Sequence, residues 1–94
     1  MTDPLFELTS FQRDLLYVIA GQTDPSGQEI KAELQGSMGE ITHGRLYPNL
    51  DTLVKKDYLD KGQSDRRTNS YQVTEKALVS LQSRRDWEDQ YVDL

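Results

Sequence analysis

Apolar side chains recur at the spacing of an α-helix in four stretches of the chain. The positions that define these stripes are Phe11, Leu15 and Ile19; Ile30 and Leu34; Leu46, Leu50 and Leu53; and Ala77, Leu78 and Leu81. Thr9 and Ser26 precede the first two stripes, and each has a Gln or Glu three residues later, which predicts capping boxes. We expect Gly21, in a left-handed conformation, and Gly36 to end these two helices. Four one-sided helices predict one small core.

The third stripe belongs to a helix that we expect to begin at Thr42, its N-cap, and to reach about residue 57. Its polar side chains follow a separate line, one residue out of phase with the leucines: Arg45, Asn49, Thr52 and Lys56. Pro48 lies inside this helix and removes one backbone hydrogen bond, so a kink or a tightened turn is expected there. The helix should therefore bury one side and present a polar side elsewhere.

A β-hairpin is predicted after the third helix. Residues 58–61 and 70–73 read as paired strands around a polar turn, and Thr74 should cap a last helix that extends to Leu94. The predicted fold is mainly α with a small β-hairpin wing (α+β), a winged helix-turn-helix with an extra C-terminal helix. We expect one domain over residues 1–94, with its core at about 8–73 and the extra helix at 74–94.

The charge of the chain is unevenly distributed. The net charge is −5, yet residues 43–71 carry six basic and four acidic side chains, which makes this segment basic. A local field of this kind attracts a polyanion even when the total charge is negative. Aspartate outnumbers glutamate, and lysine is scarce, which is typical of proteins from salt-accumulating halophiles. An ordinary acidic protein is the alternative.

The sequence offers little for catalysis or for metal binding. There is no cysteine, and His43 is the only histidine, so no metal site and no cofactor are expected. No glycine-rich phosphate loop is present, and the carboxylates are scattered, so we expect no enzyme activity. No apolar run is long enough to cross a membrane and no secretory signal is visible, so we expect no membrane association and a cytoplasmic location.

The predicted third helix and the hairpin supply the candidate DNA contacts. Arginine pairs with guanine and asparagine with adenine through two hydrogen bonds each, so Arg45 and Asn49 are the expected base-reading residues. Arg66 and Arg67, two adjacent arginines at the predicted hairpin turn, suit phosphate or minor-groove contacts. The other candidates are Thr42, His43, Thr52, Lys56 and Lys61. A solvated helix face and a hairpin kept soluble by charge are the alternative interpretations.

A second apolar stripe lies far along the last predicted helix. It consists of Trp87, Tyr91 and Leu94, and such a stripe beyond a compact core is commonly covered by a second copy of the chain. The predicted dimerisation residues are Leu78, Leu81, Trp87, Tyr91 and Leu94, and the N-terminal Leu5, Phe6 and Leu8 could join them. The alternative is packing on the first helix of the same chain.

Several motifs of the chain occur in the order and spacing of one known family. They are the segment from Gly44 to Leu50 with Leu53, then Lys56-Asp57-Tyr58-Leu59, Arg67, Tyr71 and Thr74-Glu75-Lys76. In these motifs the chain resembles the PadR family of transcriptional regulators. Two positions depart from the family pattern, because Asp57 and Ala77 stand where the family has glycine. The resemblance implies a dimeric DNA-binding repressor that dimerises through its C-terminal helix, and it places Tyr47 at the boundary between helix and DNA, within reach of a phosphate. Some family members bind small aromatic effectors, but this property is not transferred to so short a chain, and any effector is unknown.

We therefore expect a sequence-specific transcriptional regulator, a dimeric repressor that binds double-stranded DNA. It would read an inverted-repeat operator with helix 42–57 and wing 59–73. The alternative is a winged-helix module that binds another protein and has no DNA affinity.

Overall fold

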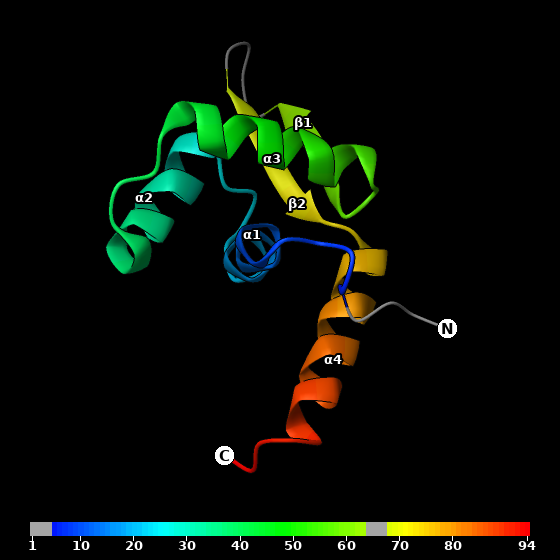
Figure 1. The fold of residues 1–94 in the computed structure, drawn as a ribbon. Coiled ribbons are helices and arrows are strands. Elements are labelled where there is room, and N and C mark those ends of the chain that lie inside the picture. Colours follow the sequence, from blue (N-terminus) through cyan, green and yellow to red (C-terminus); the bar gives the residue numbers. More distant parts are fainter. Residues whose placement is uncertain (1–4, 64–67) are drawn as a thin grey trace.

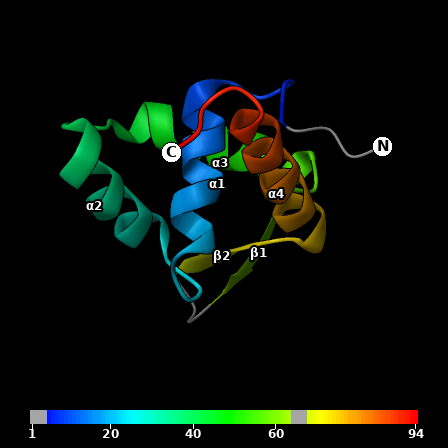
Figure 2. The same cartoon turned by 90° about the horizontal axis from the view of Figure 1, so that it is seen from below.

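The computed structural model describes residues 5–63 and 68–94. Its elements are α1 (Ser10–Ala20), α2 (Gly27–Met38), α3 (His43–Lys55), β1 (Leu59–Gln63), β2 (Asn69–Val73) and α4 (Glu75–Asp89) (Figure 1). This order confirms the predicted fold class, a mainly α domain with a two-stranded hairpin. In Figure 2, α1 lies between α2 and α4, and it also contacts α3 and β2. The first helix is therefore the centre of the packing.

Side-chain caps fix the starts of all four described helices. Thr9 and Ser26 form the predicted capping boxes, in which the cap and the third helical residue each bond the other's backbone N–H. Thr42 accepts from the N–H of Arg45, and Thr74 accepts from the N–H of Ala77. Each cap satisfies backbone donors that a helix start would otherwise leave unpaired.

The helix ends differ from the predictions. Gly21 does not adopt the left-handed conformation, since its φ is −84°. Gly36 does not stop α2, which continues to Met38 and ends at Gly39 with φ of 79°. The turn comes later because the chain must reach Ile41, which is buried and whose N–H donates to the Gln35 side chain.

The last helix ends at Asp89, so the prediction that it reaches Leu94 is wrong. The chain after Gln90 carries no helical structure. By contrast, α3 passes through Pro48 without interruption. The predicted kink or tightened turn at Pro48 stays a prediction.

A tight turn joins α3 to the hairpin. The N–H of Tyr58 donates to the carbonyl of Leu53 (2.9 Å) and that of Asp57 to the carbonyl of Val54 (3.0 Å), which is the Schellman pattern. Asp57 takes the left-handed conformation, with φ of 65°, and so fills the role for which glycine is usual. The Thr74 hydroxyl donates to the carbonyl of Asp57 (2.8 Å) and ties the start of α4 to this turn.

The hairpin is antiparallel, and its register pairs Leu59 with Val73 and Lys61 with Tyr71. Tyr58 and Tyr71 belong to the same core as the helical leucines, so the hairpin is anchored in the domain. Leu5 and Leu8 of the N-terminal segment are also buried there. Their burial leaves these two side chains unavailable to a second copy of the chain.

Candidate nucleic-acid interface

The buried side of α3 determines which residues face outward. Leu46, Leu50 and Leu53 are fully buried, so the opposite side of the helix is turned to solvent. An α-helix has 3.6 residues per turn, which puts one line of residues on that side: Gly44, Pro48, Asp51, Thr52 and Lys55. We call this set the outer line. All but the half-buried Thr52 are exposed.

The predicted base-reading residues lie beside the outer line, on the flank that meets α1. The guanidinium of Arg45 stacks over the Phe11 ring at 4.0 Å from the ring centroid. The Asn49 side chain donates to the carbonyl of Arg45 (2.7 Å) and accepts from the amide of Gln12 (3.0 Å). Both polar groups of Asn49 are thus engaged within the protein. Base reading by Arg45 and Asn49 stays a prediction, and these contacts do not favour it for Asn49.

Two further candidates from the polar line also have intramolecular contacts. The hydroxyl of Thr52 donates to the carbonyl of Pro48 (3.0 Å), so its single donor is used inside the helix. Lys56 is exposed, and its carbonyl accepts from the Lys76 ammonium group (2.8 Å). The Lys76 nitrogen also lies 4.4 Å from the centroid of the Tyr58 ring, which ties α4 to the end of α3.

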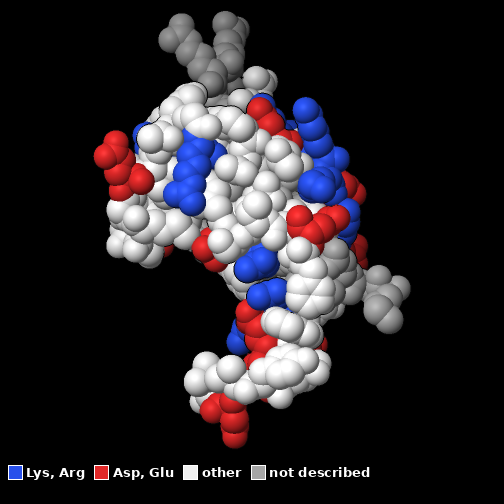
Figure 3. All heavy atoms as spheres, in the orientation of Figure 1, with Lys and Arg blue, Asp and Glu red and all other residues white. Residues whose placement is uncertain are grey.

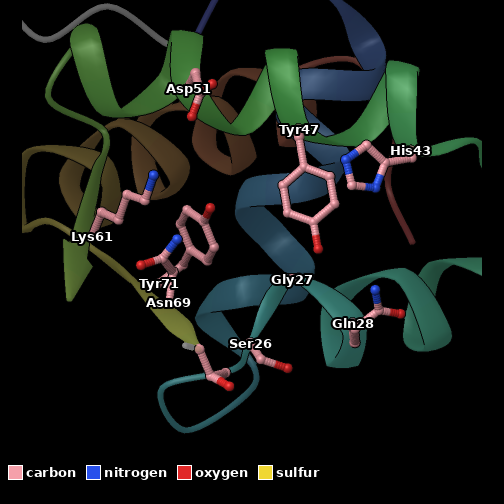
Figure 4. Close-up of a pocket in the computed structure, with 10 residues that line it drawn as sticks. Ser26, Gly27, Gln28, His43, Tyr47, Asp51, Lys61, Asn69 and Tyr71 are labelled. Atoms are coloured by element: carbon pink, nitrogen blue, oxygen red, sulfur yellow. The ribbon is translucent and has the colours of Figure 1, made fainter. Parts of the chain in front are cut away.

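On the opposite flank, α3, the N-terminus of α2 and the hairpin enclose a hollow of about 680 Å³ (Figure 4). Tyr47 and His43 reach into it from α3, and their rings lie 4.2 Å apart at 37°. Lys61 enters from β1, and Ser26 caps α2 at its floor. The hollow therefore combines a phenol, an imidazole, an ammonium group and the positive end of a helix dipole, which suit a phosphate, with the Asp51 carboxylate, which opposes one.

Gly27 lets Tyr47 occupy this position. A Cβ atom at Gly27 would lie 2.7 Å from Cε1 of Tyr47 and closer still to its hydroxyl oxygen, which is shorter than real contacts allow. Burial is the main cause that raises the pKa of Tyr71 at the back of the hollow, and the Asp51 carboxylate raises it further. The sequence interpretation missed Gly27 and Tyr71 as parts of the hollow, although the Ser26 capping box did mark the helix start.

The basic side chains on this face are separated from one another. In Figure 3, blue groups stand apart on the half of the surface that carries α3, and white surface lies between them. Thr42 is used as a cap at the exposed start of the helix, and Lys55 and Lys56 lie at its far end. Arg66 and Arg67, the predicted wing contacts, lie outside the described residues.

A separate aromatic surface lies at the end of α4. The rings of Phe6 and Trp87 meet edge to face at 5.0 Å, and those of Trp87 and Tyr91 at 5.2 Å. The guanidinium of Arg84 lies 4.8 Å from the Trp87 ring centroid and pairs with Glu88 at 3.2 Å. Phe6 is 56% exposed and Tyr91 70% exposed, so this surface is open.

The predicted dimerisation residues lie in different surroundings. Leu81 is only 6% exposed and packs in the core of its own chain, so it does not belong to the aromatic surface. Leu94 is exposed but, like Tyr91, lies beyond the end of α4, so the predicted helical stripe of Trp87, Tyr91 and Leu94 does not form. Leu78 is 51% exposed, on the first half of α4.

Within residues 5–63 and 68–94, no group of three His, Asp or Glu side chains could hold a metal ion. None of the described helices is both long and apolar enough to span a membrane.

Three helices followed by an antiparallel hairpin, with α3 exposed beside that hairpin, define a winged helix-turn-helix. The transcriptional regulator PadR-like family matches residues 15–82, and the chain belongs to this family. A comparison with curated proteins gives no match.

Solved structures agree with this assignment. The chain is similar to RosR of H. salinarum, with 38% identity, a TM-score of 0.85 and coverage of 95% of this chain and 82% of that one. A RosR complex designated S1 gives 40% identity and a TM-score of 0.84, over 89% and 75% of the two chains. The fold is also shared with Streptococcus pneumoniae FabT in complex with DNA, at 20% identity and a TM-score of 0.74, over 89% and 57%.

Proposed function

We propose that this protein is a sequence-specific DNA-binding regulator that acts as a dimeric repressor at an inverted-repeat operator. The observation that carries the proposal is the arrangement around α3, where an exposed helix side stands beside a hollow built from phosphate-binding groups. The family is one of transcriptional regulators. Related folds include FabT bound to DNA and a MarR mutant bound to operator DNA.

In the proposed complex, the outer line of α3 enters the major groove and the flanks of the helix meet the two phosphate backbones. Tyr47, His43 and Lys61 bind a phosphate in the hollow, helped by the N-terminus of α2. On the other side, Arg45 and Lys56 contact phosphate or a base at the edge of the groove. Arg66 and Arg67 of the wing reach the neighbouring backbone or the minor groove.

The aromatic surface formed by Phe6, Trp87 and Tyr91 is the proposed dimer contact. Exposed aromatic rings at the end of a helix that projects from the body need a cover, and a two-fold copy supplies the same rings in return (Figure 1). Such a dimer would place its two α3 helices ~34–36 Å apart, one turn of DNA. Binding over a promoter then excludes the transcription machinery. A protein that acts on the chromosome in this way works in the cytoplasm.

The aspartate-rich composition and the likeness to an H. salinarum protein support a halophilic origin. DNA binding should therefore be measured at high potassium chloride concentration. Operators are selected from random duplexes and bound fragments are measured by band shift. Lys61→Ala and Tyr47→Phe should each weaken binding about tenfold, whereas Arg85→Ala, an exposed arginine of α4, should not. Absence of any preferred duplex would refute the proposal.

The dimer and the repression are tested separately. Light scattering should give twice the chain mass for the wild type and a monomer for Trp87→Ser, with Val79→Ser as an exposed control on the same helix. A reporter whose promoter overlaps the selected operator should be silenced by the protein and released by the Trp87→Ser variant. A monomeric wild type, or a reporter that the protein activates, would contradict these parts of the proposal.

A further inference from the structure

The outer line of α3 contains two residues that weaken a helix. In the interior of a helix glycine costs about 1 kcal/mol relative to alanine and proline about 3 kcal/mol. Gly44 stands in the first turn of α3, so the interior value is an upper bound for it. Gly44 and Pro48 lie four residues apart and are both exposed, so they are neighbours on the same side. Apart from the two chain neighbours and the nearby backbone of α3 itself, no described atom lies within 4 Å of a Cβ built on Gly44. Packing within the described chain therefore gives no reason for a glycine at this place.

The outer line also lacks the side chains that read bases through paired hydrogen bonds. Gly44 and Pro48 have no side-chain donor, and the hydroxyl of Thr52 is already bonded to the carbonyl of Pro48. Asp51 can only accept, and Lys55 stands at the end of the helix. Besides the Asp51 carboxylate, the groups that the centre of this line offers to a groove are a bare backbone, a proline ring and a threonine methyl.

Such a surface matches one feature of the major groove. Thymine is the base that carries a methyl group there, and apolar side chains recognise it by contact. A glycine lets the helix backbone approach the bases closely, since no Cβ intervenes. The carbonyl of Gly44 also lacks its helical partner, because Pro48 has no N–H, so it can accept from a base amino group.

We propose that Gly44, Pro48 and Thr52 determine sequence specificity by contact with thymine methyl groups in the major groove. This inference rests on the proposed DNA binding and adds the kind of operator that the protein selects: each half-site has thymines facing the centre of α3. Arg45 then adds affinity from the flank, while discrimination comes from the centre of the outer line.

The test replaces thymine by uracil, which removes only the methyl group, at each position of the selected operator. One or two positions per half-site should lose about fourfold in affinity, the change that a buried methylene of 0.8 kcal/mol produces. Thr52→Ser keeps the hydroxyl and removes the methyl, so it should abolish the uracil effect at one position. Arg45→Ala should weaken binding to the thymine operator and to the uracil operator by the same factor.

Gly44→Ala supplies the test from the protein side, and Gly36→Ala is its matched control. Both glycines are exposed, lie in helices and have no described atom within 4 Å of a built Cβ, so both variants should unfold at a higher temperature. Only Gly44→Ala should lose DNA affinity, by tenfold or more. Equal binding of the thymine and uracil operators, or full affinity of Gly44→Ala, would overturn this inference alone. Failure to bind any duplex would overturn it together with the proposed function.

Discussion

Asp57 offers a quantitative test of the turn that joins the recognition helix to the wing. It holds a left-handed conformation, with φ of 65°, at the position that follows the C-cap of α3. A non-glycine residue in this region costs about 1–2 kcal/mol, and somewhat less for aspartate, whose short side chain can bond locally. Its charge also lies at the negative end of the helix dipole, which costs about 0.3–1 kcal/mol at an exposed site. Both terms predict that Asp57 is a destabilising residue.

Substitution by glycine removes both costs but increases the entropy of the unfolded chain, which offsets about 0.4–1 kcal/mol. Asp57→Gly should therefore gain about 0.5–1.5 kcal/mol in the free energy of unfolding. For a domain of this size each kcal/mol moves the melting temperature by about 4–8 °C. Asp57→Asn removes the charge and keeps a side chain that tolerates the conformation, so it should gain a smaller amount. Asp57→Ala should be less stable than the wild type, because alanine tolerates this region poorly.

The assay is thermal and urea unfolding at fixed salt and protein concentration, because a dimer's stability depends on concentration. Asp60→Gly is the control, since Asp60 is an exposed residue of β1 and glycine weakens a strand. If Asp57→Ala were as stable as Asp57→Gly, the left-handed backbone would not be the source of the effect. If Asp57→Asn matched Asp57→Gly, charge alone would account for the gain.

Three other predictions concern the hollow and its surroundings. Gly27→Ala should displace the Tyr47 ring and lower DNA affinity about tenfold, yet it should have no further effect in a Tyr47→Ala background, as a double-mutant cycle of band shifts would show. Burial raises the pKa of Tyr71 above its usual 10.0, so the folded state holds this proton more tightly than the unfolded state. Stability should consequently fall as pH rises above about 10, and less so in Tyr71→Phe, as urea unfolding at several pH values would show. Cation uptake near acids of the wing should oppose cation release from DNA, so Asp60→Asn should bind more tightly in dilute salt and lose affinity more steeply as potassium chloride rises.

The sequence predicted which elements exist because the signals for them are local. Thr9, Ser26, Thr42 and Thr74 cap helices in the structure as their spacing to the next polar residue or stripe indicated. Helix ends depend instead on where the chain must go next. Gly36 is compatible with an α-helix, so nothing local forces a stop before the chain turns towards its buried positions.

The site was predicted less well, for a geometric reason. Helical periodicity gives the angle of Arg45 and Asn49 around α3, but it does not say which neighbour stands on that side. The structure places α1 there, with Phe11 under the guanidinium and Gln12 on the amide. The hollow on the other flank is formed by three segments that are far apart in the sequence, so no local pattern could indicate it.

Residues that disfavour their own local structure are informative once their neighbours are known. Asp57 is strained, and the turn it makes places Tyr58 in the core, so its role belongs to the fold. The Tyr47 ring fills the space that a Cβ at Gly27 would need, so the role of Gly27 is to shape the hollow. Gly44 has neither justification among the described residues, because its backbone is helical and no side chain or other element would meet a Cβ built there. A cost without an intramolecular reason points to a surface outside the chain, and for the exposed side of a recognition helix that surface is the floor of the major groove.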